Sequence, residues 1–187
     1  DMIVIVPNGR NAYLGGFYTN SDVTGNWEDY LYRDVVNYVD EKYRTLAKPA
    51  SRGIAGHSMG GYGAFMLAMK HPDVFGSLYS LSPCCVGLEG DLTGDNPAWA
   101  KAAKVTTRDI FAKPPQSFED LWTKALVALS AAFAPNARKS PLFADYPFID
   151  KEGLLTRNES AFASFRTKMP LYLIEQYRGN LMKLRGI

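Results

Sequence analysis

The chain has 187 residues, of which 47% are hydrophobic, so it is long enough to form one globular domain with a single core. Lysine and arginine number 21, against 19 aspartate and glutamate residues. This balance leaves no charge surplus to attract nucleic acid or an anionic membrane surface. The longest apolar run near the start, residues 2–6, is too short to span a bilayer and has no basic leader. Composition and charge therefore argue against a nucleic-acid partner and a membrane span.

The elements expected along the chain alternate between strand and helix, the order that produces a parallel sheet covered by helices on both faces. Residues 2–6 are predicted to form a first, buried strand. Asn26 is positioned to cap the next helix, whose acidic first turn suits a helix N-terminus. The inner face of this helix is expected to carry Leu31, Val35, Tyr38 and Val39. Residues 52–55 and 76–81 read as the following two strands.

A glycine-rich loop, residues 7–25, follows the first predicted strand. It lies at the carboxyl end of that strand, where α/β sheets bind their ligands. Tyr13, Tyr18 and Asn20 therefore either border a binding site or only pack the loop.

Residues 86–168 interrupt the alternation with scattered prolines, short helical stretches at 118–132 and 158–167, and many aromatic residues. We interpret this segment as a cap-like insertion. Its aromatic side chains either line an apolar pocket or form the cap's own core, and they are Trp99, Phe111, Trp122, Phe133, Phe143, Tyr146 and Phe148. Pro170 then opens a predicted helix, and residues 184–187 begin a last strand. The apolar face of that helix is expected to carry Leu171, Ile174, Tyr177 and Leu181.

The most informative motif is Gly56-His57-Ser58-Met59-Gly60, which follows a predicted strand and precedes a helix-like stretch at 62–70. The pattern predicts a nucleophile elbow, a sharp turn that exposes a serine between strand and helix. Residues two before and two after the serine must then be small, as Gly56 and Gly60 are. The N–H of Met59 lies at the start of the helix, where unpaired N–H groups can stabilise an oxyanion. The alternative is a strand, turn and helix with a purely structural role.

Further motifs accompany this one, in the order 17–21, 25–28, 43–45, 56–64, 71–72 and 81–83. Together they resemble the esterase D and feruloyl-esterase-like branch of the α/β-hydrolases, most densely over residues 1–85. That branch includes S-formylglutathione hydrolases and mycolyltransferases, so the resemblance implies acyl chemistry on a serine without fixing one substrate. It implies an α/β-hydrolase fold with a mostly parallel sheet and helices on both faces, within which the irregular segment 86–168 is the cap-like insertion inferred above.

A serine hydroxyl needs a base, normally a histidine that a carboxylate orients. His71 lies thirteen residues beyond Ser58, a separation of about 20 Å along a helix. We expect it near the helix's C-terminal end, out of reach of the serine. His57 adjoins Ser58, but its ring is expected to point away from the hydroxyl. In the α/β-hydrolase order, the acid and then the histidine follow the serine. This order places both beyond Ile187. The fold normally has a further strand upstream, whose loop donates the second oxyanion N–H, and we expect that strand before Asp1.

We therefore expect residues 1–187 to be one α/β-hydrolase domain that is incomplete at both ends. As a central fragment it would associate with its missing flanking segments and be nearly inactive by itself. The expected function is hydrolysis of a small-molecule carboxylic ester through an acyl-enzyme on Ser58, with the Met59 N–H as an oxyanion donor and no cofactor. Acyl transfer on the same scaffold is one alternative. A non-catalytic binding module is the other.

Cys84 and Cys85 are the only cysteines, and a disulfide between sequence neighbours is strained. They do not indicate a framework of extracellular disulfides. Burial at a strand end and a second nucleophile at Cys84 are the two interpretations. With two histidines in all and no clustered ligand spacing, the sequence predicts no metal site.

Overall fold

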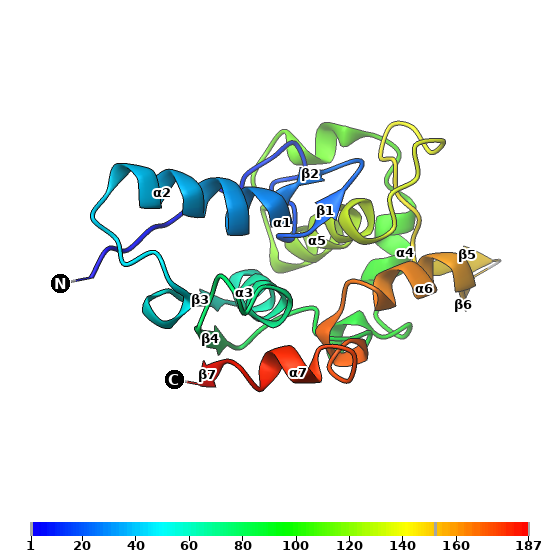
Figure 1. Ribbon diagram of the computed structural model, residues 1–187. Coiled ribbons are helices and arrows are strands. Elements are labelled where there is room, and N and C mark those ends of the chain that lie inside the picture. Colours follow the sequence, from blue (N-terminus) through cyan, green and yellow to red (C-terminus); the bar gives the residue numbers. More distant parts are fainter. Residues whose placement is uncertain (1, 152, 187) are drawn as a thin grey trace.

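The protein is described here by a computed structural model, which covers residues 2–151 and 153–186 (Figure 1). Its central sheet has three parallel strands in the order β3, β4, β7, namely β3 (Gly53–His57), β4 (Ser77–Leu81) and β7 (Arg185–Gly186). Ala55 lies opposite Tyr79, and His57 lies opposite Leu81. The strands predicted at 52–55 and 76–81 are thus confirmed. The strand predicted to start near residue 184 is also found, although residue 187 lies outside the described residues.

Only one face of this sheet is covered by a helix within the described chain. Helix α3 (Met59–Lys70) begins directly after β3 and packs against both β3 and β4 (Figure 1). Along β3 the side chains alternate between exposed and half-buried, and Tyr79 and Leu81 of β4 are 48% and 46% exposed. Because directly paired residues of neighbouring strands share a face, these exposed positions form one open surface. The expectation of helices on both faces is therefore wrong for the described residues.

The strand predicted at residues 2–6 is absent. The segment is extended without a pairing partner, and its side chains are exposed, with Met2 at 84% and Val6 at 88%. A strand needs a neighbour to accept its backbone hydrogen bonds, and no described strand lies beside this segment. The apolar run correctly indicated an extended segment, but it carried no information on whether a neighbouring strand would pair with it.

A hairpin of β1 (Asn20–Ser21) and β2 (Gly25–Asn26) leads into a helical stretch that has three consecutive parts. These parts are α1 (Trp27–Asp29), a π-helical segment (Tyr30–Val35) and α2 (Val36–Lys42). The predicted cap at Asn26 is wrong, because its side chain makes no capping bond. Asn20 performs this role instead: its Oδ1 accepts the N–H groups of Glu28 and Asp29 at 3.0 and 3.2 Å. The predicted inner face is only half-buried, and Tyr38 is 57% exposed.

Within the segment 86–168, helices are found at the two stretches where the sequence predicted them, 118–132 and 158–167. Its elements are a 3-10 turn (Gly90–Leu92), α4 (Ala98–Ala103), a second 3-10 turn (Arg108–Phe111), α5 (Phe118–Phe133), the hairpin β5 (Phe148–Lys151) and β6 (Leu154–Arg157), and α6 (Glu159–Arg166). A further 3-10 turn (Pro49–Ser51) precedes β3. The long helix expected after Pro170 is not formed. The chain makes one 3-10 turn (Pro170–Tyr172), irregular turns and then the short α7 (Arg178–Leu181).

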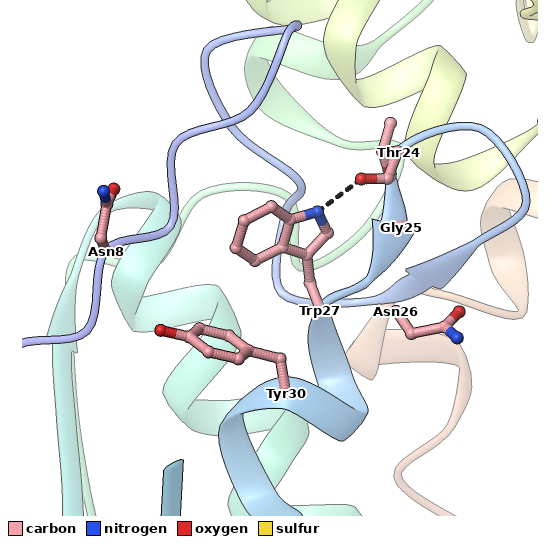
Figure 2. A pocket seen from close by; sticks show the side chains of 6 residues that line it. All are labelled: Asn8, Thr24, Gly25, Asn26, Trp27 and Tyr30. Carbon is pink, nitrogen blue, oxygen red and sulfur yellow. Dashed lines mark hydrogen bonds between the residues drawn. The ribbon is translucent and has the colours of Figure 1, made fainter. Parts of the chain in front are cut away.

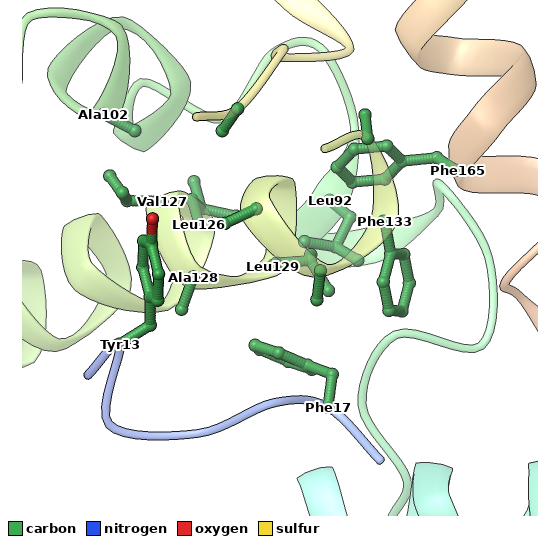
Figure 3. Close-up of a cluster of buried hydrophobic side chains, with 14 of the residues drawn as sticks. Tyr13, Phe17, Leu92, Ala102, Leu126, Val127, Ala128, Leu129, Phe133 and Phe165 are labelled. Atoms are coloured by element: carbon green, nitrogen blue, oxygen red, sulfur yellow. The ribbon is translucent and has the colours of Figure 1, made fainter. Parts of the chain in front are cut away.

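The core joins the helical segment to α3 and to the glycine-rich loop (Figure 3). Tyr13 and Phe17 of the loop face α5 in this view, and the rings of Phe17 and Phe133 lie 5.9 Å apart between centroids. Phe133 also lies 5.5 Å from the ring of Tyr62 in α3. Trp99 and Phe133 are completely buried. Of the two interpretations of the aromatic residues, core packing is therefore correct for these two, and for Phe111, which is 8% exposed.

Candidate active site

Ser58 lies at the turn between β3 and α3 in a backbone conformation that is unusual for a residue with a side chain. Its φ is 55° and its ψ is −117°, and holding such a conformation costs on the order of 1–3 kcal/mol. The Ser58 N–H donates to the Leu81 carbonyl at 3.0 Å, and the Ser58 carbonyl accepts the Tyr62 and Cys84 N–H groups at 3.0 and 3.1 Å. The turn is thus held by the first turn of α3, by the end of β4 and by the segment that follows β4.

The Ser58 side chain is exposed and does not cap the helix that it precedes. A serine at this position normally accepts an N–H of the first helical turn through its hydroxyl. Among the described residues, no hydrogen bond to the Ser58 hydroxyl is found. The Met59 N–H opens α3 and likewise has no acceptor within the described part of the chain. A free hydroxyl therefore lies next to a free N–H at the positive end of a helix.

The two glycines of the motif have different surroundings. A Cβ built on Gly56 would lie 2.1 Å from the Gly60 carbonyl oxygen, so the close approach of strand and helix requires glycine there. A Cβ on Gly60 would meet nothing within 4 Å. The expectation that both positions must be small holds for Gly56 and is wrong for Gly60. The next residue, Gly61, is confined by the Leu81 carbonyl oxygen, which would lie 2.9 Å from a Cβ at this position.

Neither histidine is hydrogen-bonded to Ser58. His71 directly follows α3, as predicted, and its Nε2 lies 2.9 Å from Oε1 of Glu28. Its ring also stacks on Tyr32, with 3.7 Å between centroids and 9° between planes. His57 is the last residue of β3, and its side chain is exposed. The structure thus gives His71 a stacking partner in Tyr32 and a hydrogen-bonding partner in Glu28, both remote in sequence from the serine.

Glu28 is the buried carboxylate that binds His71, and the sequence did not indicate it. Its carboxylate is 11% exposed and also accepts from Lys70 Nζ at 2.5 Å. Burial alone would raise the pKa of Glu28, but the hydrogen bonds and charges of His71 and Lys70 outweigh burial and lower that pKa. The two partners lie 42 and 43 residues away along the chain, so no local pattern could have indicated this cluster.

The three loop residues proposed to border a site are separated by the structure. The Tyr13 hydroxyl donates a hydrogen bond to the Leu142 carbonyl at 2.9 Å and accepts one from Arg108 Nη2 at 2.7 Å, and the residue is buried in the hydrophobic core. Asn20 caps α1. Tyr18 packs its ring on Gly63 of α3, and the charge of Cys84 adds to burial in raising the Tyr18 pKa. Of the three, only Tyr18 therefore lies near the turn that holds Ser58.

The glycine-rich loop also approaches the start of α3 directly. A Cβ on Gly15 would lie 3.2 Å from the terminal methyl carbon of Met59, and a Cβ on Gly16 would overlap the Trp27 ring at 2.1 Å. Trp27 in turn lines a shallow cavity of about 430 Å³ (Figure 2), whose other lining residues are Asn8, Thr24, Gly25, Asn26 and Tyr30. A second cavity of about 290 Å³ lies between α6 and the turn after Pro170. Neither cavity is lined by Ser58 or Met59.

The cysteines are free thiols, and both are half-buried. They follow β4 and pack against the hydrophobic core, which agrees with the interpretation of burial at a strand end. Within the described residues, no cluster of three or more histidine, cysteine or acidic side chains is arranged to hold a metal ion. No helix of the described part of the chain is both long and apolar enough to cross a membrane.

Comparison with known proteins points to one family. The family model Esterase, described as "Putative esterase", matches residues 1–139. Two curated relatives from strains of Mycobacterium tuberculosis, Esterase MT1326 and Esterase Rv1288, are each 35% identical to this chain over 85 residues. The matched stretch is 43% of this chain and only 18% of either relative. The chain therefore spans a small part of the length of these relatives.

Proposed function

Because the chain belongs to the esterase family described as "Putative esterase", we propose that it contributes the nucleophile for hydrolysis of carboxylic esters, and that this nucleophile is Ser58. The observation that carries the proposal is the turn itself. Ser58 stands between β3 and α3 with φ at 55°, its hydroxyl free of a helix-capping bond. A strained residue that exposes a reactive side chain at the end of a parallel strand is typical of nucleophiles in α/β enzymes.

In the proposed reaction, the Ser58 Oγ attacks the ester carbonyl carbon while a base takes its proton. The carbonyl oxygen becomes an oxyanion, and the Met59 N–H donates a hydrogen bond to it. Collapse of this intermediate expels the alcohol and leaves an acyl group on Ser58. Water then attacks the acyl carbon and releases the acid. No metal or cofactor takes part in any of these steps.

The proposal assigns the general base to neither histidine of this chain. His71 is bound to Glu28 and stacked on Tyr32, and His57 has no hydrogen bond to Ser58. The named relatives extend far beyond the 85 matched residues, so a base and an acid from another part of a longer protein are compatible with the proposal. The same proposal implies that residues 1–187 alone have little activity, because a serine without its base remains protonated.

The test is covalent labelling of the full-length protein with a fluorophosphonate, read by intact mass. We expect one adduct, which Ser58→Ala removes, together with a fall in ester hydrolysis on the order of 10³-fold or more. Ser82→Ala is the matched control, because Ser82 is also exposed and also has a positive φ, at 41°. It should retain both the adduct and the activity. Labelling that persists in Ser58→Ala would refute the assignment.

A second candidate is a binding module that keeps the scaffold without the reaction. It is favoured by the lack of any hydrogen bond between Ser58 and a histidine of the described chain. The two functions differ in the labelling result, since a serine that no base activates should not react with the fluorophosphonate. Acyl transfer is a variant of the first candidate, and a competing alcohol in the assay would reveal it as a second ester product.

A further inference from the structure

Two adjacent cysteines follow β4 in the segment that is hydrogen-bonded to the proposed nucleophile. The last residue of β4 and the segment after it make two of the backbone hydrogen bonds that hold Ser58: the Leu81 carbonyl accepts the Ser58 N–H at 3.0 Å, and the Cys84 N–H donates to the Ser58 carbonyl at 3.1 Å. Cys84 therefore fixes the position of the Ser58 peptide through its own backbone. Any change at the Cys84 side chain that moves this backbone must also move the turn.

The side chains of Cys84 and Cys85 are in direct contact. The Cys85 thiol donates a hydrogen bond to the Cys84 sulfur at 2.6 Å, and the two are not joined as a disulfide. That hydrogen bond lowers the pKa of Cys84 although burial opposes it. The same bond and burial raise the pKa of Cys85 well above its ordinary value. The pair thus combines one thiol that ionises readily with one that keeps its proton.

These features match what a redox-sensitive thiol requires. Oxidants of low molecular mass react with a thiolate that solvent can reach, and the product is captured when a second thiol lies beside it. Cys84 is half-buried and Cys85 is its immediate neighbour. The backbone is already unusual here, since Cys85 has φ at 61° and Ser82 has φ at 41°.

We propose that Cys84 and Cys85 form a peroxide-reactive redox pair, and that its oxidation weakens the reactivity of Ser58. The second half of this inference rests on the proposed function of Ser58. The first half does not, because it concerns only the chemistry of the two thiols.

The oxidation proceeds in two balanced steps. The Cys84 thiolate attacks one oxygen of hydrogen peroxide, the O–O bond breaks, and Cys84 becomes a sulfenic acid while hydroxide leaves and takes up a proton. The Cys85 sulfur, losing its proton, then attacks the Cys84 sulfur, so that an S–S bond forms, the S–O bond breaks and water leaves. In sum, two thiols lose two electrons and two protons, and peroxide is reduced to two water molecules.

Oxidation reaches Ser58 through the geometry of neighbouring residues. Consecutive Cα atoms lie about 3.8 Å apart, whereas disulfide-bonded cysteines usually have their Cα atoms about 4.4–6.8 Å apart. A disulfide between neighbours therefore distorts the peptide that joins them. Because the Cys84 N–H is bonded to the Ser58 carbonyl, this distortion is expected to lengthen or break that bond and to loosen the turn.

The experiment treats the full-length protein with hydrogen peroxide and digests it with trypsin without reduction. Residues 71–101 form a single tryptic peptide that contains both cysteines and no methionine, so methionine oxidation does not disturb its mass. We expect this peptide to lose two hydrogen atoms and to regain them with dithiothreitol. Its mass should not change in Cys84→Ser. In Cys85→Ser, dimedone should trap the sulfenic acid on Cys84.

The fluorophosphonate reaction of Ser58 supplies the second readout. We expect the oxidised protein to be labelled several-fold more slowly than the reduced protein, and Cys84→Ser to be insensitive to peroxide. A wild-type peptide that gains oxygen or a dimedone adduct, without losing two hydrogens, overturns the redox pair. Loss of two hydrogens with an unchanged labelling rate overturns the coupling to Ser58. Absence of labelling in both redox states contradicts the proposed function while the peptide mass still decides the redox pair.

Discussion

The two glycines of the turn, Gly56 and Gly60, differ sharply in how well they should tolerate a larger side chain, although the motif requires a small residue at both positions. Gly56→Ala would place a methyl group 2.1 Å from the Gly60 carbonyl oxygen, and relieving this overlap requires β3 and α3 to separate. We expect a loss of about 3 kcal/mol in the free energy of unfolding. Chemical denaturation monitored by circular dichroism measures it.

Gly60→Ala is the matched control for this prediction. Its methyl group meets nothing within 4 Å and lies in the first turn of α3. Alanine favours helix over glycine by up to about 1 kcal/mol, so this variant should be as stable as the wild type or more stable. A loss at Gly60 equal to that at Gly56 would show that the strand and helix are not packed as described.

Glu28 is expected to make the stability of the protein sensitive to acid. Its pKa in the folded protein is below the ordinary value of 4.5, because His71 and Lys70 outweigh the effect of burial. A carboxylate with a lowered pKa contributes stability that is full above its unfolded pKa and is lost as the pH falls through the folded pKa. The contribution of Glu28 should therefore be constant near neutral pH and decline below about pH 4.5.

Glu28→Gln tests this directly through thermal unfolding at a series of pH values. Near neutral pH the variant should be less stable by about 1.5–3 kcal/mol, the usual contribution of a hydrogen bond to a charged group. The difference from the wild type should shrink as the pH is lowered below 4.5. His71→Gln is the companion variant, since it removes one partner and leaves Lys70, and it should leave fluorophosphonate labelling of Ser58 unchanged. A difference that is independent of pH would mean that Glu28 is not ionised in this cluster.

At the scale of the elements, helix α1 is capped by a residue that does not directly precede it in the sequence. Asn26 stands immediately before the helix, yet Asn20 supplies the acceptor for two N–H groups, and its Nδ2 also donates to Asp29 at 2.7 Å. Asn20→Ala should cost about 0.5–2 kcal/mol of stability, the range measured for helix caps. Asn26→Ala, which removes no capping bond, should cost much less. Equal losses in urea titrations of the two variants would contradict the assignment.

The elements that the sequence predicted well are those whose signals are local. Strand β3 and helix α3 follow from an apolar run and a helix stop at His71 and Pro72, and helix α5 follows from the helical stretch predicted at 118–132. Elements that depend on distant partners were predicted poorly. Residues 2–6 lack a neighbouring strand, and the chain after Pro170, whose Leu171 N–H donates to the distant Val86 carbonyl, forms turns where the sequence predicted a helix.

The same distinction applies to the candidate site. Ser58 and the position of Met59 follow from a short motif, since a strand, a turn and a helix in that order suffice to expose them. Glu28 is 42 residues from Lys70, its nearer partner along the chain, and Cys84 is 26 residues from Ser58. Such contacts arise only once β4 lies beside β3 and α1 lies beside the end of α3. A single sequence carries no periodic signal for them.

At the scale of the whole molecule, the described chain has a well-packed half and an open half. Trp99, Tyr62 and Phe133 lie in a core that joins the helical segment to one side of α3. On the other side, the sheet presents Tyr79 and Leu81 to solvent, and residues 2–6 extend without contacts that bury them. Membership of the esterase family thus coexists with a small sheet, and the fold is best described as mixed α/β with a three-stranded parallel sheet.

Because of this open half, we expect residues 1–187 to associate with one another in solution. Contiguous exposed apolar surface and unpaired strand edges favour contacts between molecules, and Val4 and Val6 are 68% and 88% exposed. Sedimentation should show an average mass that rises with concentration. Changing both valines to lysine should reduce the association by adding repulsive charge at the segment. It should leave the thermal unfolding midpoint nearly unchanged, because these side chains bury little surface.

The control carries the same charge at positions away from the open half, namely Thr106→Lys with Ser160→Lys, both at exposed sites. If association came from general properties such as net charge, both double variants would reduce it equally. If it comes from the exposed apolar segment, only the valine variant does so. A wild-type chain that stays monomeric over the whole concentration range would mean that these side chains are covered in solution. The exposure of residues 2–6 and of the open sheet face would then be wrong.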